Sequence, residues 1–389
     1  MNKRQLAAES LGVCSSAVIF FCLQLVFLGR PSITGDGSMY LAAAGGAEIP
    51  PPWSFHVLTP WLAGHLFSRD VELGFIVIGC LSFAGAAVCC VWLVGAVLPR
   101  STRSERILGA MLFAVSGPGT MMFRLAYFTD PLSYFLLAAA CVAVVYRQHA
   151  IVALITAVGV WNRETALFVM PVWIVNELLI RDRSVSRTIL YFALTFVPAA
   201  AAYYVLHFTA AYFGSIPPHL NYLDPGVISA LWRSSLSWLG TDNVVLGLAI
   251  CVVLAYGPSW IVAAVGFSKF VRRWREAPHV MALCGLATPV LATLSIVDWR
   301  RGFQPVFPLV VVLTILGVRS LVSGTVSWFV AASTLLLGTL FCSEAWWVPP
   351  IRYPAIAGFV IFGGGLVVAK IAARRAQGLS EVSSKGVEA

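Results

Sequence analysis

Long apolar runs recur from one end of this chain to the other, and they constrain its fold more than any other feature. Hydrophobic residues make up 59% of the 389 residues, charged residues only 11%, and the mean hydropathy is +0.86. A run of roughly 17 to 25 apolar residues is long enough to cross the hydrocarbon core of a bilayer as a helix. The sequence therefore predicts an all-α integral membrane protein without a sizeable soluble domain.

The apolar runs, divided at their polar interruptions, predict about twelve transmembrane helices, within a range of about ten to thirteen. Their centres lie near residues 20, 85, 115, 138, 155, 172, 198, 255, 287, 310, 333 and 361. The runs near 115, 138 and 155 are shorter than a bilayer requires. Glycines and prolines interrupt other runs, at Gly117, Pro118, Gly119, Pro289, Pro305 and Pro308. Short or broken helices occur in membranes where they are buried in protein or line a cavity, so we expect a cavity that opens to the outer face.

The basic residues give an independent indication of topology. If both termini are cytoplasmic, 18 of the 26 basic residues, including every lysine, fall on cytoplasmic segments. This asymmetry is typical of multi-pass proteins of a plasma membrane, here expected to be a bacterial inner membrane. The net charge of +9 is then a topology signal, and it gives no reason to expect a nucleic-acid partner. The nine cysteines lie in or beside apolar runs without metal-ligand spacing, so we expect neither disulfides nor a metal site.

Polar and ionisable residues gather in short segments at the predicted outer ends of the spans. These segments are GDGSMY with Asp36, Ser38 and Tyr40; WSFHVLTPWLAG with His56; FRLAYFTDPLSYF with Arg124 and Asp130; VWNRETALF with Asn162, Arg163 and Glu164; and IVDWRRGFQP with Asp298, Arg300 and Arg301. An ionisable group at membrane depth costs several kcal/mol unless water or a partner is present, which makes such a residue a functional candidate.

Each of these residues also has a purely structural interpretation. Asp36 precedes a glycine, as in many turns, and Asp130 in TDP could only cap a helix. Arg163 and Glu164 could form a structural ion pair, the DWRR segment could be a solvated turn, and His56 could simply pack. The joint pattern favours a functional site, because three separate outer segments combine a carboxylate with arginine. Arginine is the better partner for a phosphate in a partly dry site.

The first-loop aspartate in GDGSMY, the interfacial helix expected over WSFHVLTPWLAG, the acidic YFTDPLSYF segment and the polar NRETALF break together resemble the C-type glycosyltransferase superfamily. The resemblance covers residues 1–180, which it identifies as the catalytic transmembrane module. Residues 181–375 are then a variable transmembrane module, and residues 376–389 a disordered cytoplasmic tail. Members of this superfamily transfer a sugar from a polyprenyl-phosphate carrier to an acceptor on the extracytoplasmic face.

The resemblance implies an inverting transfer that needs a base for the acceptor hydroxyl and cations for the departing phosphate. Asp36 is the candidate base, with Asp130 as the second catalytic carboxylate. The candidate phosphate-binding residues are Arg163, Arg300, Arg301 and Arg124. The candidate substrate-binding residues are Ser38, Tyr40, His56, Asn162, Glu164 and Asp298. No cofactor is expected, although Asp36 and Asp130 could share a divalent cation.

Two other functions fit parts of the pattern. A polysaccharide polymerase or lipid-linked oligosaccharide ligase would share the arginine-rich outer loops and the lipid-phosphate substrate. A multispanning transporter or flippase would share the intramembrane charges, but it should show an internal repeat. The sequence shows no such repeat, and its acidic outer segments lie mainly in the first half. It leaves open the sugar, the acceptor and whether the donor carries one phosphate or two.

Overall fold

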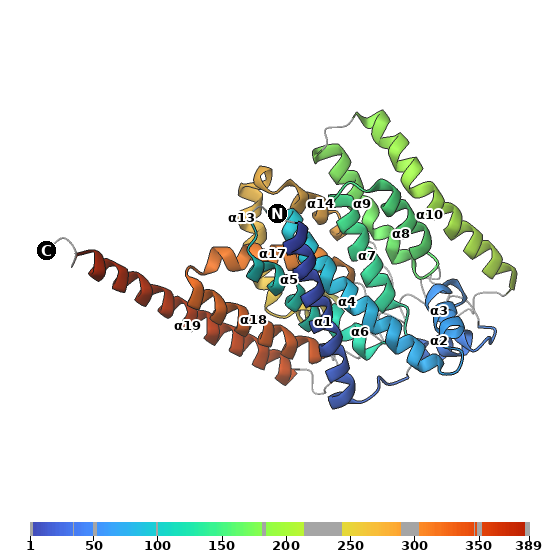
Figure 1. The fold of residues 1–389 in the computed structure, drawn as a ribbon, viewed down its shortest axis with the longest axis horizontal. Coiled ribbons are helices and arrows are strands. Elements are labelled where there is room, and N and C mark those ends of the chain that lie inside the picture. Colours follow the sequence, from blue (N-terminus) through green and yellow to red (C-terminus); the bar gives the residue numbers. More distant parts are fainter. Residues whose placement is uncertain are drawn as a thin grey trace.

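The computed structural model describes residues 3–33, 35–49, 53–98, 100–180, 184–213, 243–288, 303–345, 347 and 352–385. Within these ranges the chain forms helices and no strand, as predicted (Figure 1). The N-terminal helices are α1 (Lys3–Leu28), α2 (Asp36–Ala44), η1 (Trp53–Phe55), α3 (Leu58–Leu66), α4 (Val71–Val97), α5 (Arg103–Val115), α6 (Gly117–Arg124), α7 (Asp130–Val145), α8 (His149–Gly159), η2 (Glu164–Phe168), α9 (Val169–Val175) and the π-helical turn η3 (Asn176–Ile180).

The C-terminal half continues with α10 (Val185–Phe213), α12 (Val244–Tyr256), α13 (Ser259–Arg272), η5 (Trp274–Glu276), α14 (Pro278–Cys284), η6 (Gln304–Val306), α17 (Phe307–Leu321), α18 (Thr325–Glu344) and α19 (Arg352–Lys385). Six helical segments are long and apolar enough to cross a membrane: α1, α4, α10, η6 together with α17, α18 and α19. These six match the runs predicted near residues 20, 85, 198, 310, 333 and 361. The protein is therefore a multi-pass helical membrane protein.

The predicted number of about twelve spans is not confirmed. The runs near 115 and 255 each form a bent pair of helices, α5 with α6 at 50° and α12 with α13 at 92°, so the described residues contain at most eight spans by length and composition. The runs near 138 and 155 form the short helices α7 and α8. The run near 172 is divided among η2, α9 and η3, and part of the run near 287 lies outside the described residues.

The helix breaks follow from backbone chemistry at glycine and proline. The α5–α6 bend falls at Ser116, directly before the Gly117, Pro118, Gly119 sequence, as the interruption predicts. Pro305 and Pro308, in contrast, do not interrupt a span. They lie in the first turns of η6 and α17, where the missing N–H needs no helical partner. Pro289 lies outside the described residues.

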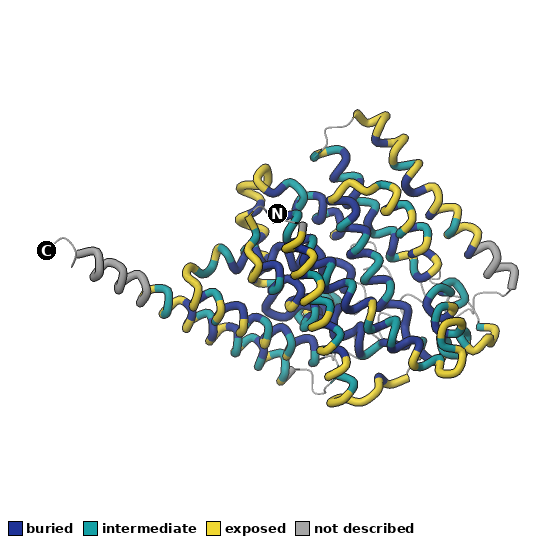
Figure 2. Tube along the Cα trace, in the orientation of Figure 1, coloured by how far each residue is buried: buried dark blue, intermediate teal, exposed yellow. Residues whose placement is uncertain are grey.

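Helices α4, α7 and α17 form the interior of the bundle (Figure 2). Helix α4 packs against α1, α5 and α7, while α8 packs between α7 and α10. Helices α1, α10 and α19 each leave one face exposed, as expected for surfaces that meet lipid (Figure 2). Helices α18 and α19 lie side by side, and α19 extends beyond the others to Lys385 (Figure 1). Residues 376–385, where we predicted a disordered tail, are thus helical in the structure.

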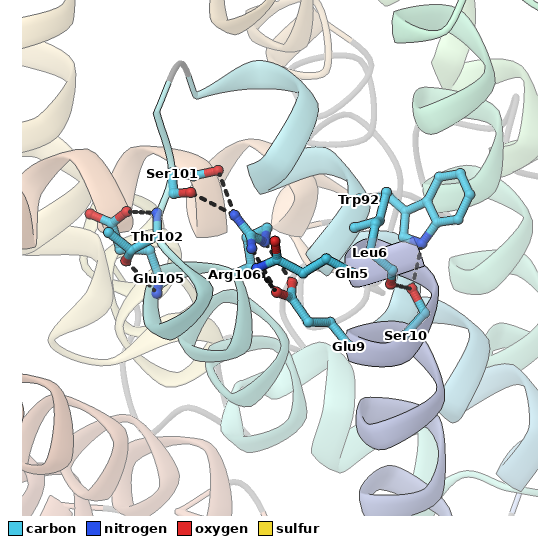
Figure 3. Close-up of polar contacts among 9 residues, drawn as sticks. All are labelled: Gln5, Leu6, Glu9, Ser10, Trp92, Ser101, Thr102, Glu105 and Arg106. Carbon is cyan, nitrogen blue, oxygen red and sulfur yellow. Dashed lines mark hydrogen bonds and ion pairs between the residues drawn. The ribbon is translucent and has the colours of Figure 1, made fainter. Parts of the chain in front are cut away.

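Buried ion pairs join α1, α5 and α17 at the end of the bundle that carries the N-terminus. The guanidinium of Arg106 donates to both carboxylate oxygens of Glu9 at 2.7 Å, and to the carbonyl of Ser101 at 2.6 Å (Figure 3). The neighbouring Glu105 accepts from Arg319 of α17 at 2.5 and 2.7 Å and forms a capping box with Thr102. Adjacent residues of α5 therefore hold two different helices.

Candidate functional site

At the opposite end of the bundle, the start of α4 packs against α2 and α3 (Figure 1). Here Asn162, which is fully buried, joins three segments through its amide. Its Nδ2 donates to the carbonyl of Thr129 and to Oγ of Ser133, both at 2.8 Å. Its Oδ1 accepts from the hydroxyl of Thr59 at 2.5 Å. The backbone N–H groups of Val57 and Leu58 add two bonds to the carbonyl of residue 161, at 2.9 and 3.0 Å. The predicted NRE break thus fixes the start of α3 against the start of α7.

Tyr40, His56 and Glu164 form a second connection between the same segments. The hydroxyl of Tyr40 lies 2.7 Å from Nδ1 of His56, and Nε2 of His56 lies 3.2 Å from Oε2 of Glu164. Tyr40 and His56 are buried, whereas the side chain of Glu164 is 51% exposed. This chain of groups therefore begins in the interior and ends on an accessible carboxylate.

The Glu164 carboxyl is held in its ionised form. The protein that surrounds it raises its pKa, but the hydrogen bond from His56 and the charges of His56 and Arg163 outweigh this effect. The net result is a pKa well below the ordinary value for glutamate. At neutral pH Glu164 therefore acts as a hydrogen-bond acceptor.

Arg163 pairs with the first residue of α7. Its Nη1 donates to Oδ1 of Asp130 at 2.6 Å, and both side chains are largely buried, at 17% and 3% exposure. Asp130 is the first residue of α7 and precedes Pro131, which is also the arrangement of an ordinary helix start. Arg163 thus pairs with Asp130 and Glu164 pairs with His56, in addition to the electrostatic interaction between the two neighbours.

Asp36 begins α2, where we had considered an isolated turn. It is partly exposed, and Gly35 before it has φ +50°, a value that favours glycine. A Cβ on Gly37 would lie 3.2 and 3.3 Å from side-chain atoms of Phe128 and Tyr127. Gly37 thus permits close packing of α2 against the segment that leads to Asp130. Ser38 is exposed, and its hydroxyl donates to the carbonyl of Gly35 at 2.8 Å.

Arg124 has a partner outside this cluster. Its Nη2 donates to Oε2 of Glu344 at the end of α18, at 2.7 Å, and its guanidinium lies 6.0 Å from the ring of Trp347. This contact ties α6 to α18, and the role of Arg124 in phosphate binding stays a prediction. Asp298, Arg300 and Arg301 lie outside the described residues.

The pattern of charges did not identify Thr59 and Ser133 as parts of this cluster. Each is a buried hydroxyl residue inside an apolar helix, close in sequence to His56 or Asp130. Such a residue next to a candidate site is a usable signal, because a buried hydroxyl needs a partner. In the part of the chain that the structure describes, no group of three or more His, Cys, Asp or Glu side chains is placed to hold a metal ion.

An apolar groove runs along α7 from Phe135 to Tyr146, toward the end of the helix that is far from Asp130. It has a volume of about 450 Å³ and is lined by residues of α4, α7 and α8 and the turn between the last two. The lining side chains include Phe135, Ala139 and Ile155, and Trp92, Tyr146 and Gln148 border the groove nearer the end of α7. A groove of this composition suits a hydrocarbon chain.

Comparison with protein-family models, with curated proteins and with solved structures finds no match. The fold defines the class, a multi-pass helical membrane protein, and the polar cluster at one end of the bundle is its candidate site.

Proposed function

We propose that the protein is a membrane glycosyltransferase of the C-type superfamily. It moves a sugar from a polyprenyl-phosphate carrier to an acceptor on the extracytoplasmic face of a bacterial inner membrane, with both termini in the cytoplasm. The convergence of four segments carries this proposal. Residues 36–40, 56–59, 129–133 and 162–164 are far apart in the sequence, and hydrogen bonds and close packing bring them into one polar cluster.

The exposure of the carboxylates supports different roles for them. Asp130 is buried against Arg163, so it positions that arginine. Asp36 is partly exposed beside the same cluster and keeps the role of base for the acceptor hydroxyl. Arg163 is the phosphate-binding candidate within the described cluster, because Arg124 is engaged with Glu344. The apolar groove farther along α7 fits a part of the prenyl chain that is distant from the phosphate.

Replacement of Asp36 by Asn tests this function. The variant keeps the size of the side chain but cannot accept a proton, and general-base assistance is worth about a hundredfold to ten-thousandfold in rate. Sugar transfer should therefore fall at least about a hundredfold at unchanged protein level. The measurement is transfer of radiolabelled sugar from a panel of polyprenyl-phosphate sugars in membranes that contain the native acceptors.

The matched control is Glu48→Gln, which removes another exposed carboxylate from the same predicted loop. It should leave the transfer rate unchanged. Normal transfer by Asp36→Asn would reduce Asp36 to a helix-start residue. Absence of transfer by the wild-type protein from every member of the panel would favour the polymerase or transporter alternatives.

A further inference from the structure

The direction of the hydrogen bond between His56 and Glu164 can be assigned from its chemistry. An ionised carboxylate can only accept, so Nε2 of His56 carries the hydrogen that it donates to Glu164. The other ring nitrogen, Nδ1, lies 2.7 Å from the hydroxyl of Tyr40, which can either donate to it or accept from it. The histidine is thus held in one orientation between two partners.

This arrangement fixes the direction of the Glu164 carboxylate. One oxygen is engaged by His56, and the side chain remains 51% exposed. The carboxylate of Asp130, in contrast, is 3% exposed and paired with Arg163. Of these two carboxylates, Glu164 is the one that is both held in place and accessible to a ligand.

The charge of Glu164 decides which part of a lipid-linked sugar it could contact. A carboxylate repels a phosphate, but it accepts charge-assisted hydrogen bonds from hydroxyl groups. The surroundings also suit a polyhydroxyl ligand. Ser54 and Thr165, which lie near His56 and beside Glu164 in the sequence, have buried hydroxyls without a partner among the described residues. Tyr203 of α10 lies within electrostatic reach of Glu164 and brings an aromatic ring.

We propose that Glu164, positioned by His56 and Tyr40, binds hydroxyl groups of the sugar on the lipid donor. This inference rests on the proposed function and adds a division of roles to it. Arg163 and Asp130 serve the phosphate, Asp36 serves the acceptor, and Glu164 distinguishes a glycosylated donor from the bare lipid phosphate. His56 and Tyr40 are positioning residues for that contact.

The test compares affinities in the full-length protein in nanodiscs. The probes are farnesyl phosphate and its glucosyl, mannosyl and arabinofuranosyl conjugates. The wild-type protein should prefer at least one conjugate over farnesyl phosphate. Glu164→Gln should lower that preference about tenfold or more while the affinity for farnesyl phosphate is retained, because a charge-assisted hydrogen bond is lost.

If His56 and Tyr40 position Glu164, their substitutions should reduce the preference for the glycosylated probe to different degrees. His56→Leu should lose the preference, whereas His56→Gln should keep part of it, since the glutamine amide can still donate to Glu164. Tyr40→Phe removes a single hydroxyl and should reduce the preference partially, which provides a milder test if other variants fail to fold. Glu48→Gln is the control and should bind all probes as the wild-type protein does.

The possible failures are distinct. If Glu164→Gln and His56→Leu keep the wild-type preference, Glu164 does not bind the sugar, although the donor class still holds. If the wild-type protein binds every conjugate and farnesyl phosphate equally, sugar recognition at this site is also excluded. If the wild-type protein binds none of the probes, the proposed function itself fails.

Discussion

Asn162 shows how an uncharged residue can assemble a charged site. Its amide accepts from Thr59 and donates to Ser133 and to the backbone at residue 129, so a neutral side chain holds three segments together. Arg163 and Glu164, which follow it, diverge toward different partners. Because the amide carries no charge, its burial avoids the desolvation penalty of an ion, and each of its bonds is directional.

The Asp130 to Arg163 pair makes a prediction about stability. Asp130→Asn removes one charge of a largely buried pair and leaves the guanidinium uncompensated. Breaking such a pair costs on the order of 3 kcal/mol. We expect a clearly lower melting temperature for the purified protein in detergent.

Arg30→Gln is the matched control, because it breaks an exposed pair with Glu72 at 3.5 Å, with the side chains 67% and 41% exposed. An exposed pair contributes less than about 1 kcal/mol. Equal melting temperatures for Asp130→Asn and the wild-type protein would show that the pair contributes nothing to folding and serves only the site.

At the scale of the helical elements, the sequence identified segments better than it identified their shapes. The Gly117 to Gly119 break was predictable, because glycine and proline act on the local backbone. Helix α2 was not predictable, because Asp36 followed by glycine is locally a turn signal. The helix is supported by packing against residues 127 and 128. The candidate residues were found because charges are rare in an apolar chain. The Tyr40 to Glu164 connection spans long sequence separations, which no local pattern encodes.

Contact between α2 and α3 depends on Gly64. A Cβ at this position would overlap the carbonyl oxygen of Ala44, so Gly64→Ala should force the two short helices apart. We expect a loss of about 1 to 3 kcal/mol of stability in this region. The measurement is faster limited proteolysis between α2 and α3, together with a lower melting temperature.

Gly363→Ala in α19 is the control, because a Cβ there meets nothing within 4 Å. That substitution should be neutral or slightly stabilising, since alanine favours a helix. If the two variants behave alike, the close approach of α2 and α3 is not required.

At the scale of the whole molecule, the apolar runs predicted a multi-pass helical protein, and the structure shows one. The number of about twelve crossings was not established, because residues near 115, 155, 172 and 255 form bent or short helices that composition alone cannot distinguish from complete spans. The distribution of basic residues remains the argument for which end faces the cytoplasm.

Cysteine labelling tests that orientation. In a cysteine-free background, a cysteine at Ser38 should react with an impermeant thiol reagent added from outside, whereas cysteines at Ser184 and Ser268 should not. All three positions are exposed, so differences in labelling report the side of the membrane. Labelling of position 38 only after the membrane is opened would exclude an outer-face site.

The bond between Thr59 and Asn162 also sets an order of events during biosynthesis. Its two partners are 103 residues apart. His56, with Tyr40 behind it, likewise cannot contact Glu164 until that later residue has been synthesised. At about 5 to 20 residues per second, the ribosome needs roughly 5 to 20 seconds to make the intervening chain. The segment with Asp36 and His56 must therefore persist without these partners until the later segment has been made. Only the insertion of a later helical hairpin can give it its final partners.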